Sequence, residues 1–266
     1  GDGVILGDLS LEWFFKPEQH SLLFKMRLPG PRHLDGTAAS VAAASGWNYF
    51  HWLLDVLPRF GILRQAGWNL ELFDWFILNS GNAAFQKESL DWLGIPVEKR
   101  VFTARGTHLT TDQLIVPSLP GIPSQTPPWV VDFLKQTFPA SIEPSTKQEK
   151  LYISRSRSRY RTFTNEAEVR AFLLERGFRE IFAEELSFRE QVNLFASASV
   201  IVAPHGAGLS NLVFCRPGTR VIEIFSPSYV NGCFWVIANW AKLDYYYLIG
   251  EGTRPPEFHD PHRVEQ

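Results

Sequence analysis

The sequence has little cysteine, with only Cys215 and Cys233 among its 266 residues. Two cysteines cannot form a disulfide framework or a cysteine-only zinc site, so a reducing compartment is expected. Two long runs without charged residues, 36–54 and 194–215, contain Gly, Ser, Asn and His, and neither predicts a bilayer span. With no secretory leader and no Asn-x-Ser/Thr acceptor in the sequence, we expect a cytoplasmic location.

Neither sign of charge is in excess, because 26 Lys and Arg face 28 Asp and Glu, for a net charge of -2. This balance argues against a nucleic acid as partner. Apolar residues at 45% and charged residues at 20% are typical of a globular protein rather than a disordered one. The aromatic content of 14%, with nine Trp and 21 Phe, indicates a heavy core, a sugar-stacking surface or a partner interface.

Several familiar catalytic motifs are missing. The sequence has no Asp-x-Asp, the carboxylate pair that commonly holds a metal–nucleotide complex, and no Walker A motif. It also lacks His-Glu-x-x-His and Gly-x-Ser-x-Gly, which argues against a zinc peptidase and an α/β-hydrolase. We therefore expect no metal site and no cofactor.

The second half of the chain alternates strand-like and helix-like segments. Strands are expected at 151–154, 178–183, 199–203 and 220–225, and helices at 165–177, 187–198 and 207–215. Asn165 with Glu168 and Ser187 with Glu190 each have the spacing of a capping box. Such alternation predicts a parallel, Rossmann-like sheet with right-handed crossovers.

The first half is less regular, but it also predicts an α/β lobe. Strands are expected at 40–44, 75–78, 100–103 and 113–116, and helices at 48–66, 83–93 and 129–138, with a kink at Pro58. A Pro-rich stretch and a polar one surround the last of these helices, which suggests a boundary there. The expected lobes are residues 1–140 and 141–266.

The most specific local pattern runs from Ala203 to Asn211, at the end of an apolar strand and the start of a helical segment. Ligands bind at this edge of a parallel sheet, glycines allow close approach, and free amides favour phosphate. The candidate ligand residues are His205, Gly206, Ala207, Gly208, Leu209 and Asn211. The alternative is a tight turn with a satisfied histidine, since the third glycine of the dinucleotide fingerprint is missing.

Two further charged residues lie near this edge. Glu223 interrupts the apolar strand 220–225, where a carboxylate needs a partner, either a ribose or an arginine such as Arg155. Arg155 directly follows the strand at 151–154 and opens a run of four alternating arginines. Its guanidinium suits phosphate, while the other three arginines are expected in solvent. Short Arg/Ser runs are also found in solvated loops and RNA-binding segments.

A second candidate cluster lies in the first half, where His51, Asp55 and Arg59 are spaced four residues apart on one helix face. A carboxylate orients an imidazole to accept a proton, which suggests a general base. The alternative is a surface ion pair of Asp55 with Arg59. The apolar character of the helix favours the functional interpretation.

These segments resemble glycosyltransferase family 61. The similarity lies in the blocks NYFHWLLDVLPR, LYISRSRSRYR, NEAEV and EELSFREQVNLFASASVIVAPHGAGLSNLVFCRPGTRVIEIF, within residues 47–225. The resemblance implies a GT-B-like α/β architecture, two Rossmann-like lobes facing a central cleft, and metal-independent transfer with inversion. The chain is most similar to bacterial members, which act in capsular polysaccharide synthesis.

The resemblance also implies roles for the candidate residues. A nucleotide sugar, with UDP as the expected nucleotide, would be held by the second lobe. Glu223 would bond the ribose. The diphosphate would be bound by Arg155, His205 and the amides of 206–209, and Glu184 would help to shape the base pocket. His51 or Asp55 would deprotonate the glycan acceptor, and the resemblance suggests peripheral association with a lipid-linked acceptor. Alternatives are a nucleotide-binding scaffold without turnover and an NAD-linked oxidoreductase, although the latter lacks a fingerprint in the first lobe.

Overall fold

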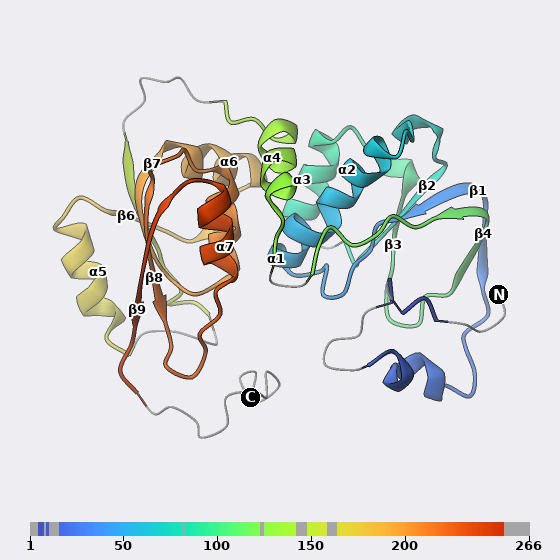
Figure 1. Ribbon diagram of the computed structural model, residues 1–266, viewed down its shortest axis with the longest axis horizontal. Coiled ribbons are helices and arrows are strands. Elements are labelled where there is room, and N and C mark those ends of the chain that lie inside the picture. The colour runs from blue at the N-terminus through green and yellow to red at the C-terminus, as the bar shows by residue number, and fades with distance from the viewer. Residues whose placement is uncertain are drawn as a thin grey trace. The chain divides into compact units, whose positions relative to one another are not determined.

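The computed structural model describes residues 5–7, 9–10, 16–81, 83–122, 125–141, 148–158 and 164–252. The chain divides into two compact units, unit 1 (Gly1–Ile122) and unit 2 (Pro123–Gln266). Each unit is built around a parallel sheet (Figure 1), so the expected α/β class is confirmed. The division falls before helix α4 (Pro128–Thr137), whereas the boundary expected from the sequence falls after it.

The sheet of unit 1 has the strand order β3-β2-β1-β4. Its strands are β1 (Arg32–Ser40), β2 (Trp75–Leu78), β3 (Arg100–Phe102) and β4 (Leu109–Ile115). The chain moves outward from β1 through β2 to β3, and β4 then pairs with the opposite side of β1. The direction in which the chain adds strands to the sheet therefore reverses between β1 and β4.

One long helical segment and several short ones complete unit 1. The long one comprises α1 (Tyr49–His51), the π-helical turn η3 (Trp52–Val56) and α2 (Leu57–Gln65). The others are α3 (Ala84–Trp92) and the 3-10 helices η1 (Pro17–Gln19), η2 (Ser21–Phe24), η4 (Leu70–Leu72) and η5 (Val97–Lys99). The helices expected at 48–66 and 83–93 are confirmed. The strand expected at 40–44 is wrong, because β1 ends at Ser40.

The sheet of unit 2 has the order β6-β5-β7-β8-β9. Its strands are β5 (Glu149–Ile153), β6 (Arg179–Ile181), β7 (Ala198–Pro204), β8 (Arg220–Phe225) and β9 (Asp244–Ile249). Helix α5 (Glu166–Leu174) lies on one side of the sheet, and α6 (Phe188–Ser197) and α7 (Cys233–Trp240) lie on the other (Figure 1). The 3-10 helices are η6 (Ala183–Glu185) and η7 (Ala207–Phe214). The four strands expected in this half are confirmed.

Apolar side chains fill both faces of this sheet. On the α5 side, Leu173 packs with Tyr152 and Val202. On the other side, Phe188 makes edge-to-face contacts with Phe138 of the segment after α4 and with Phe214 of η7. Both cysteines are buried. The large aromatic content therefore supplies much of the core.

Helix ends in unit 2 test the two expected capping boxes. The Ser187 hydroxyl accepts from the Glu190 amide at 3.3 Å, and the Glu190 carboxylate accepts from the Ser187 amide at 2.8 Å. Asn165 precedes α5 but makes no side-chain cap bond, so only the box at Ser187 is confirmed. Gly177, with φ +79°, ends the α5 segment as a left-handed residue. None of the described helices has the length and hydropathy needed to cross a bilayer.

Candidate functional site

In the sheet of unit 2, the direction in which the chain adds successive strands reverses between β5 and β7. The chain goes from β5 to β6 at one edge and then returns to place β7 on the other side of β5. Doubly wound sheets bind ligands at the carboxyl ends of the two strands that flank such a reversal. Here those ends lead into Arg155, after β5, and the segment 205–208, after β7.

Arg155 and Gly206 are in close contact at this point. A Cβ atom built on Gly206 would overlap the guanidinium group of Arg155. The φ of Gly206 is 176°, an extended value that any residue adopts, so glycine is needed here for space. The structure thus brings together the two segments that the sequence singled out, a guanidinium and a glycine turn.

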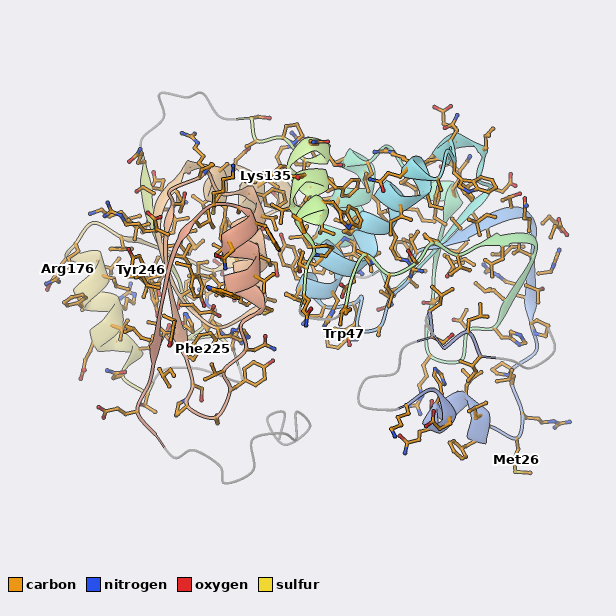
Figure 2. The ribbon with its side chains drawn as sticks, viewed as in Figure 1. Met26, Trp47, Lys135, Arg176, Phe225 and Tyr246 are labelled. Atoms are coloured by element: carbon orange, nitrogen blue, oxygen red, sulfur yellow. The ribbon has the colours of Figure 1, made fainter. Side chains whose placement is uncertain are left out.

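His205 lies buried beside Glu223. Its Nδ1 is 2.5 Å from Glu223 Oε1, and 4% of its surface is exposed. The imidazole ring is surrounded by aromatic rings, with centroid distances of 5.3 Å to Phe225, 5.1 Å to Tyr229 and 5.0 Å to Phe234. Phe225 ends β8 (Figure 2). These contacts hold the ring in one orientation.

Glu223 itself is fully buried, at 0% exposure. One carboxylate oxygen pairs with His205 and the other accepts from the hydroxyl of Tyr245 on β9. The partners of the Glu223 carboxylate are thus His205 and Tyr245 rather than Arg155, the alternative to a ribose that the sequence offered. Because this carboxylate is fully buried, a ribose could reach it only if the side chains around it moved.

Asn211 is also turned inward, since its side chain is fully buried in η7. Its amide donates to Gln191 Oε1 at 2.8 Å and to the Gly208 carbonyl at 3.1 Å. Asn211 was expected to contact the ligand, whereas these bonds fix the shape of the glycine turn. Leu209 is buried as well, and Ala207 and Gly208 are partly exposed.

The rim of this edge carries Glu184, which is exposed in η6 after β6. The next residue, Glu185, forms an ion pair with Arg157. The Arg157 guanidinium lies 3.9 Å from the centroid of the Phe182 ring. Arg157 is exposed, as expected from the sequence, and it also contacts this rim. Arg159 and Arg161 lie outside the described residues.

In unit 1, His51 and Asp55 form a pair on the long helical segment. His51 Nδ1 and Asp55 Oδ2 are 2.7 Å apart, with 21% and 25% of the side chains exposed. The Asn48 side chain accepts from the Phe50 amide at 2.9 Å and so caps the helix start. The structure confirms that these two residues are partners, and their partial exposure leaves the pair accessible.

Arg59, in contrast, is a buried clamp rather than a surface partner of Asp55. It is 1% exposed and donates to the carbonyls of Ala42, after β1, and Pro117, after β4. Burial lowers the pKa of Arg59 to about 10, an effect that the charge of Asp55 partly offsets. The guanidinium therefore stays charged at neutral pH and anchors this helix at the reversal point of the unit 1 sheet.

The turn that carries Asp55 is unusually wide. Leu57 donates its amide to the Trp52 carbonyl, five residues back, which makes η3 a π-helical turn. Pro58 follows, and a proline ring clashes with the carbonyl four residues before it in a regular α-helix. The kink expected at Pro58 thus takes the form of a π turn, a feature that is frequent at functional sites.

The loop between β1 and this helix is held by side chains from elsewhere in unit 1. The Asn79 amide group bonds both the amide and the carbonyl of Ala43, at 3.0 and 2.8 Å. Ser45 adopts φ +56°, a conformation that costs a non-glycine residue energy and is maintained only by its surroundings. The loop ends at Trp47, which is 63% exposed (Figure 2). A large aromatic ring is thereby presented four residues before His51.

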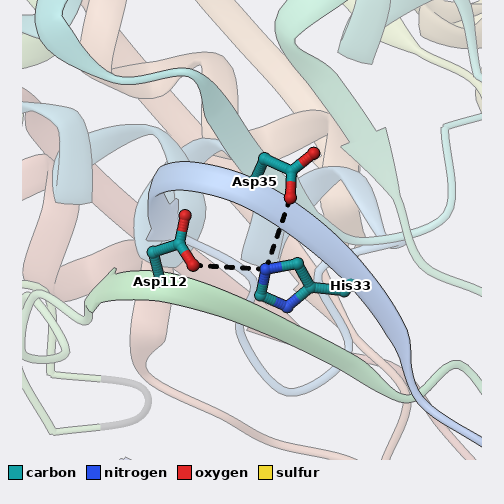
Figure 3. A group of neighbouring side chains, drawn as sticks. All are labelled: His33, Asp35 and Asp112. Carbon is teal, nitrogen blue, oxygen red and sulfur yellow. Dashed lines mark ion pairs between the residues drawn. The ribbon is translucent and has the colours of Figure 1, made fainter.

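A separate group in unit 1 has the residue types of a metal site. His33 Nε2 lies 3.5 Å from Asp35 and 3.3 Å from Asp112 (Figure 3). All three side chains are exposed, and Asp112 also accepts from the Gly36 amide at 2.7 Å. That backbone bond is the main reason why the pKa of Asp112 lies below its usual range. The carboxylate therefore already has a structural function.

Two residues of the unit 2 site could not be identified from the sequence. Tyr245 reaches Glu223 because β9 pairs with β8, and Tyr229 meets His205 from the loop that follows β8. A run of three tyrosines in the sequence carries no signal for such a contact. The pairing of an edge strand, which the sequence did not predict, creates it.

The protein has two parallel sheets, and in unit 2 a guanidinium packs on a glycine turn at the point where the strand order reverses. These features define a doubly wound α/β protein. Residues 49–222 match the family Glycosyltransferase 61, and the chain belongs to this family. The resemblance inferred from the motifs is confirmed at the family level.

Two plant proteins share a short segment with the chain. Beta-1,2-xylosyltransferase RCN11 of Oryza sativa subsp. japonica is 39% identical over 68 residues, which are 26% of this chain and 13% of that protein. Beta-1,2-xylosyltransferase of Arabidopsis thaliana is 39% identical over 61 residues, or 23% of this chain and 11% of that protein. The chain thus matches only a small part of the length of either relative.

Proposed function

We propose that this protein transfers a sugar from a nucleotide sugar to a hydroxyl group of a glycan. UDP is the proposed nucleotide, the anomeric centre is inverted and no divalent metal takes part. The observation that carries this proposal is the contact of Arg155 with Gly206 at the reversal point of the unit 2 sheet, in a chain of the glycosyltransferase 61 family. The two plant relatives suggest UDP-xylose as the first donor to try.

On the donor side, the diphosphate needs positive charge that does not come from a metal. Arg155 offers a guanidinium, which matches phosphate oxygens in pairs, and the start of η7 offers backbone amides. As the bond between the sugar and the diphosphate breaks, negative charge grows on the leaving oxygen, and these groups stabilise it. His205 is the third group of this donor site, and Glu184 is proposed to border the base.

On the acceptor side, the pair of His51 and Asp55 is the proposed base. The attacking hydroxyl must lose its proton as the new bond to the anomeric carbon forms. Asp55 holds Nδ1 of the imidazole, which suits His51 as the acceptor of that proton and Asp55 as the group that orients it. Trp47, exposed four residues earlier, is a suitable surface for stacking a sugar ring.

The wider setting of the reaction follows from the resemblance alone. It comprises a GT-B-like architecture, capsular polysaccharide synthesis in a bacterial cytoplasm, and peripheral association with a lipid-linked acceptor. A crystal structure with bound UDP tests the architecture. Sedimentation with vesicles carrying a lipid-linked glycan tests the peripheral association.

The test of the proposal has two stages. Thermal unfolding with UDP, GDP, CMP and NADH identifies the ligand, since a ligand of the native state raises the melting temperature. Release of UDP from UDP-xylose, UDP-glucose and UDP-N-acetylglucosamine is then measured with a panel of oligosaccharide acceptors. Stabilisation by UDP together with acceptor-dependent UDP release supports the proposal. Stabilisation by NADH without any effect of UDP would instead favour an oxidoreductase.

Variants locate the donor site. Arg155→Ala and His205→Ala are each expected to weaken UDP binding while the fold stays intact. The matched control is Arg157→Ala, because Arg157 is exposed and pairs with Glu185 at the rim. Unchanged UDP affinity in both donor-site variants would remove this assignment. Binding of UDP without sugar transfer to any acceptor would favour the second candidate, a nucleotide-binding scaffold.

A further inference from the structure

Three polar side chains form a chain of hydrogen bonds that ends at the proposed donor site, and two of them, Glu223 and His205, are buried. Tyr245 donates to one oxygen of Glu223, and the other oxygen of Glu223 lies 2.5 Å from His205 Nδ1. The strands explain this geometry. Val221 pairs with Tyr245 and Ala203 pairs with Glu223, so neighbouring strands bring the three residues together.

Glu223 has no contact with solvent, and a buried carboxylate is unfavourable unless both oxygens are hydrogen-bonded. Tyr245 satisfies one oxygen permanently, because burial and the bond to Glu223 raise the pKa of its hydroxyl above the usual range. The hydroxyl therefore remains a donor at any physiological pH. It holds the carboxylate in the orientation that meets the imidazole.

The carboxylate in turn determines which nitrogen of His205 carries hydrogen. A carboxylate accepts hydrogen bonds, so the ring must carry a hydrogen on Nδ1. A phosphate oxygen is likewise an acceptor, so a ring that bonds phosphate through Nε2 must carry a second hydrogen there. The negative charge of Glu223 stabilises this doubly protonated ring. The other titratable groups near the network are Tyr229, Cys233, Tyr247 and Arg155.

We propose that Tyr245 is a positioning residue, which acts through Glu223 to fix the tautomer and orientation of His205 at the donor site. The assignment rests on the proposed function in one respect only, the contact between His205 and the diphosphate. It gives Glu223 a role different from ribose binding, since its carboxylate is fully buried and hydrogen-bonded to His205 and Tyr245.

Nitrogen NMR of the histidine side chains tests, without any ligand, whether Tyr245 and Glu223 fix the tautomer of His205. The His205 signals are identified by their loss in His205→Gln. In the wild-type protein we expect hydrogen on Nδ1, and in Tyr245→Phe and Glu223→Gln we expect the hydrogen to be shared with Nε2. The control is Tyr246→Phe, because Tyr246 is the next residue on β9 and is 59% exposed. A wild-type ring protonated on Nε2 alone, or an unchanged pattern in both variants, would overturn the proposal.

Titration with UDP tests whether this hydrogen-bond network affects binding of the nucleotide at the donor site. Binding is expected to produce the doubly protonated ring in the wild-type protein, and the dissociation constant for UDP is expected to rise about 3- to 10-fold in Tyr245→Phe. Tyr246→Phe should bind UDP as the wild type does. Equal UDP affinity in Tyr245→Phe and wild type would show that the network has no effect on the ligand. Failure of the wild-type protein to bind UDP would refute the proposed function, and the tautomer measurement would stand separately.

Discussion

The guanidinium of Arg155 occupies the space that a side chain at position 206 would need. Arg155 follows β5 and Gly206 follows β7, and these two strands pair with each other. A guanidinium group and a glycine turn therefore lie together at this edge of the sheet.

Gly206→Ala should displace Arg155 and weaken UDP binding about 10-fold, the loss of one charge-assisted hydrogen bond. The measurement is isothermal titration calorimetry. Gly232→Ala is the matched control, because a Cβ there meets nothing within 4 Å and its φ is -79°. Equal affinity of Gly206→Ala and wild type would mean that the position of Arg155 does not matter for the nucleotide.

His51→Gln should reduce sugar transfer about 100-fold or more if the imidazole is the base, with UDP affinity unchanged. Asp55→Asn should reduce it less, because the carboxylate orients the ring and does not take the proton. The control is Asp35→Asn, a fully exposed carboxylate in the same unit. A larger loss for Asp55→Asn than for His51→Gln would reverse the two roles.

Sugar transfer should proceed at the same rate in EDTA as in Mg²⁺. His33→Ala, which removes the imidazole from the exposed group of His33, Asp35 and Asp112, should leave the rate unchanged as well. Initial rates of UDP release measure both effects. A rate that falls in EDTA and returns with Mg²⁺ would contradict the metal-independent mechanism.

Arg59→Met should lower the free energy of unfolding by about 2–4 kcal/mol, because the carbonyls of Ala42 and Pro117 lose their buried donor. Arg64→Met is the control on the same helix, where the side chain is exposed, and its effect should stay within about 0.5 kcal/mol. Chemical denaturation compares the two. Similar effects of both substitutions would argue against the clamp.

Ser187→Ala should lower the free energy of unfolding by about 1 kcal/mol, the typical contribution of a helix N-cap. Asn165→Ala should have little effect, because Asn165 makes no cap bond at the start of α5. Thermal unfolding of the two variants makes the comparison. A larger effect at position 165 would show that a cap forms there in solution.

Much of unit 2 could be predicted because its signals are local. The apolar run at 199–203, the capping box at Ser187 and Gly177 each determine structure within a few residues. In the same way, the spacing of His51 and Asp55 on a helix predicted their contact. Local spacing was not sufficient everywhere, because Asn165 and Glu168 have the spacing of a capping box but Asn165 makes no side-chain cap bond.

Three features that the sequence did not reveal have non-local causes. The apolar residues 41–44 suggested a strand, but Asn79 binds the backbone of Ala43 and turns the chain into a loop. Asp55 with Arg59 suggested an ion pair, but two carbonyls from distant loops hold the guanidinium. Tyr245, a partner of Glu223 that the sequence did not indicate, comes from the pairing of β8 with β9. Each depends on tertiary contacts that spacing along the chain does not encode.

The last strand of the unit 2 sheet has a practical consequence for anyone who expresses this protein. The family match ends at residue 222, one position before Glu223. A fragment trimmed to that limit would keep Arg155 and the glycine turn but lose the carboxylate and the tyrosine behind His205. Cloning boundaries for binding assays therefore belong beyond Ile249, where β9 is complete.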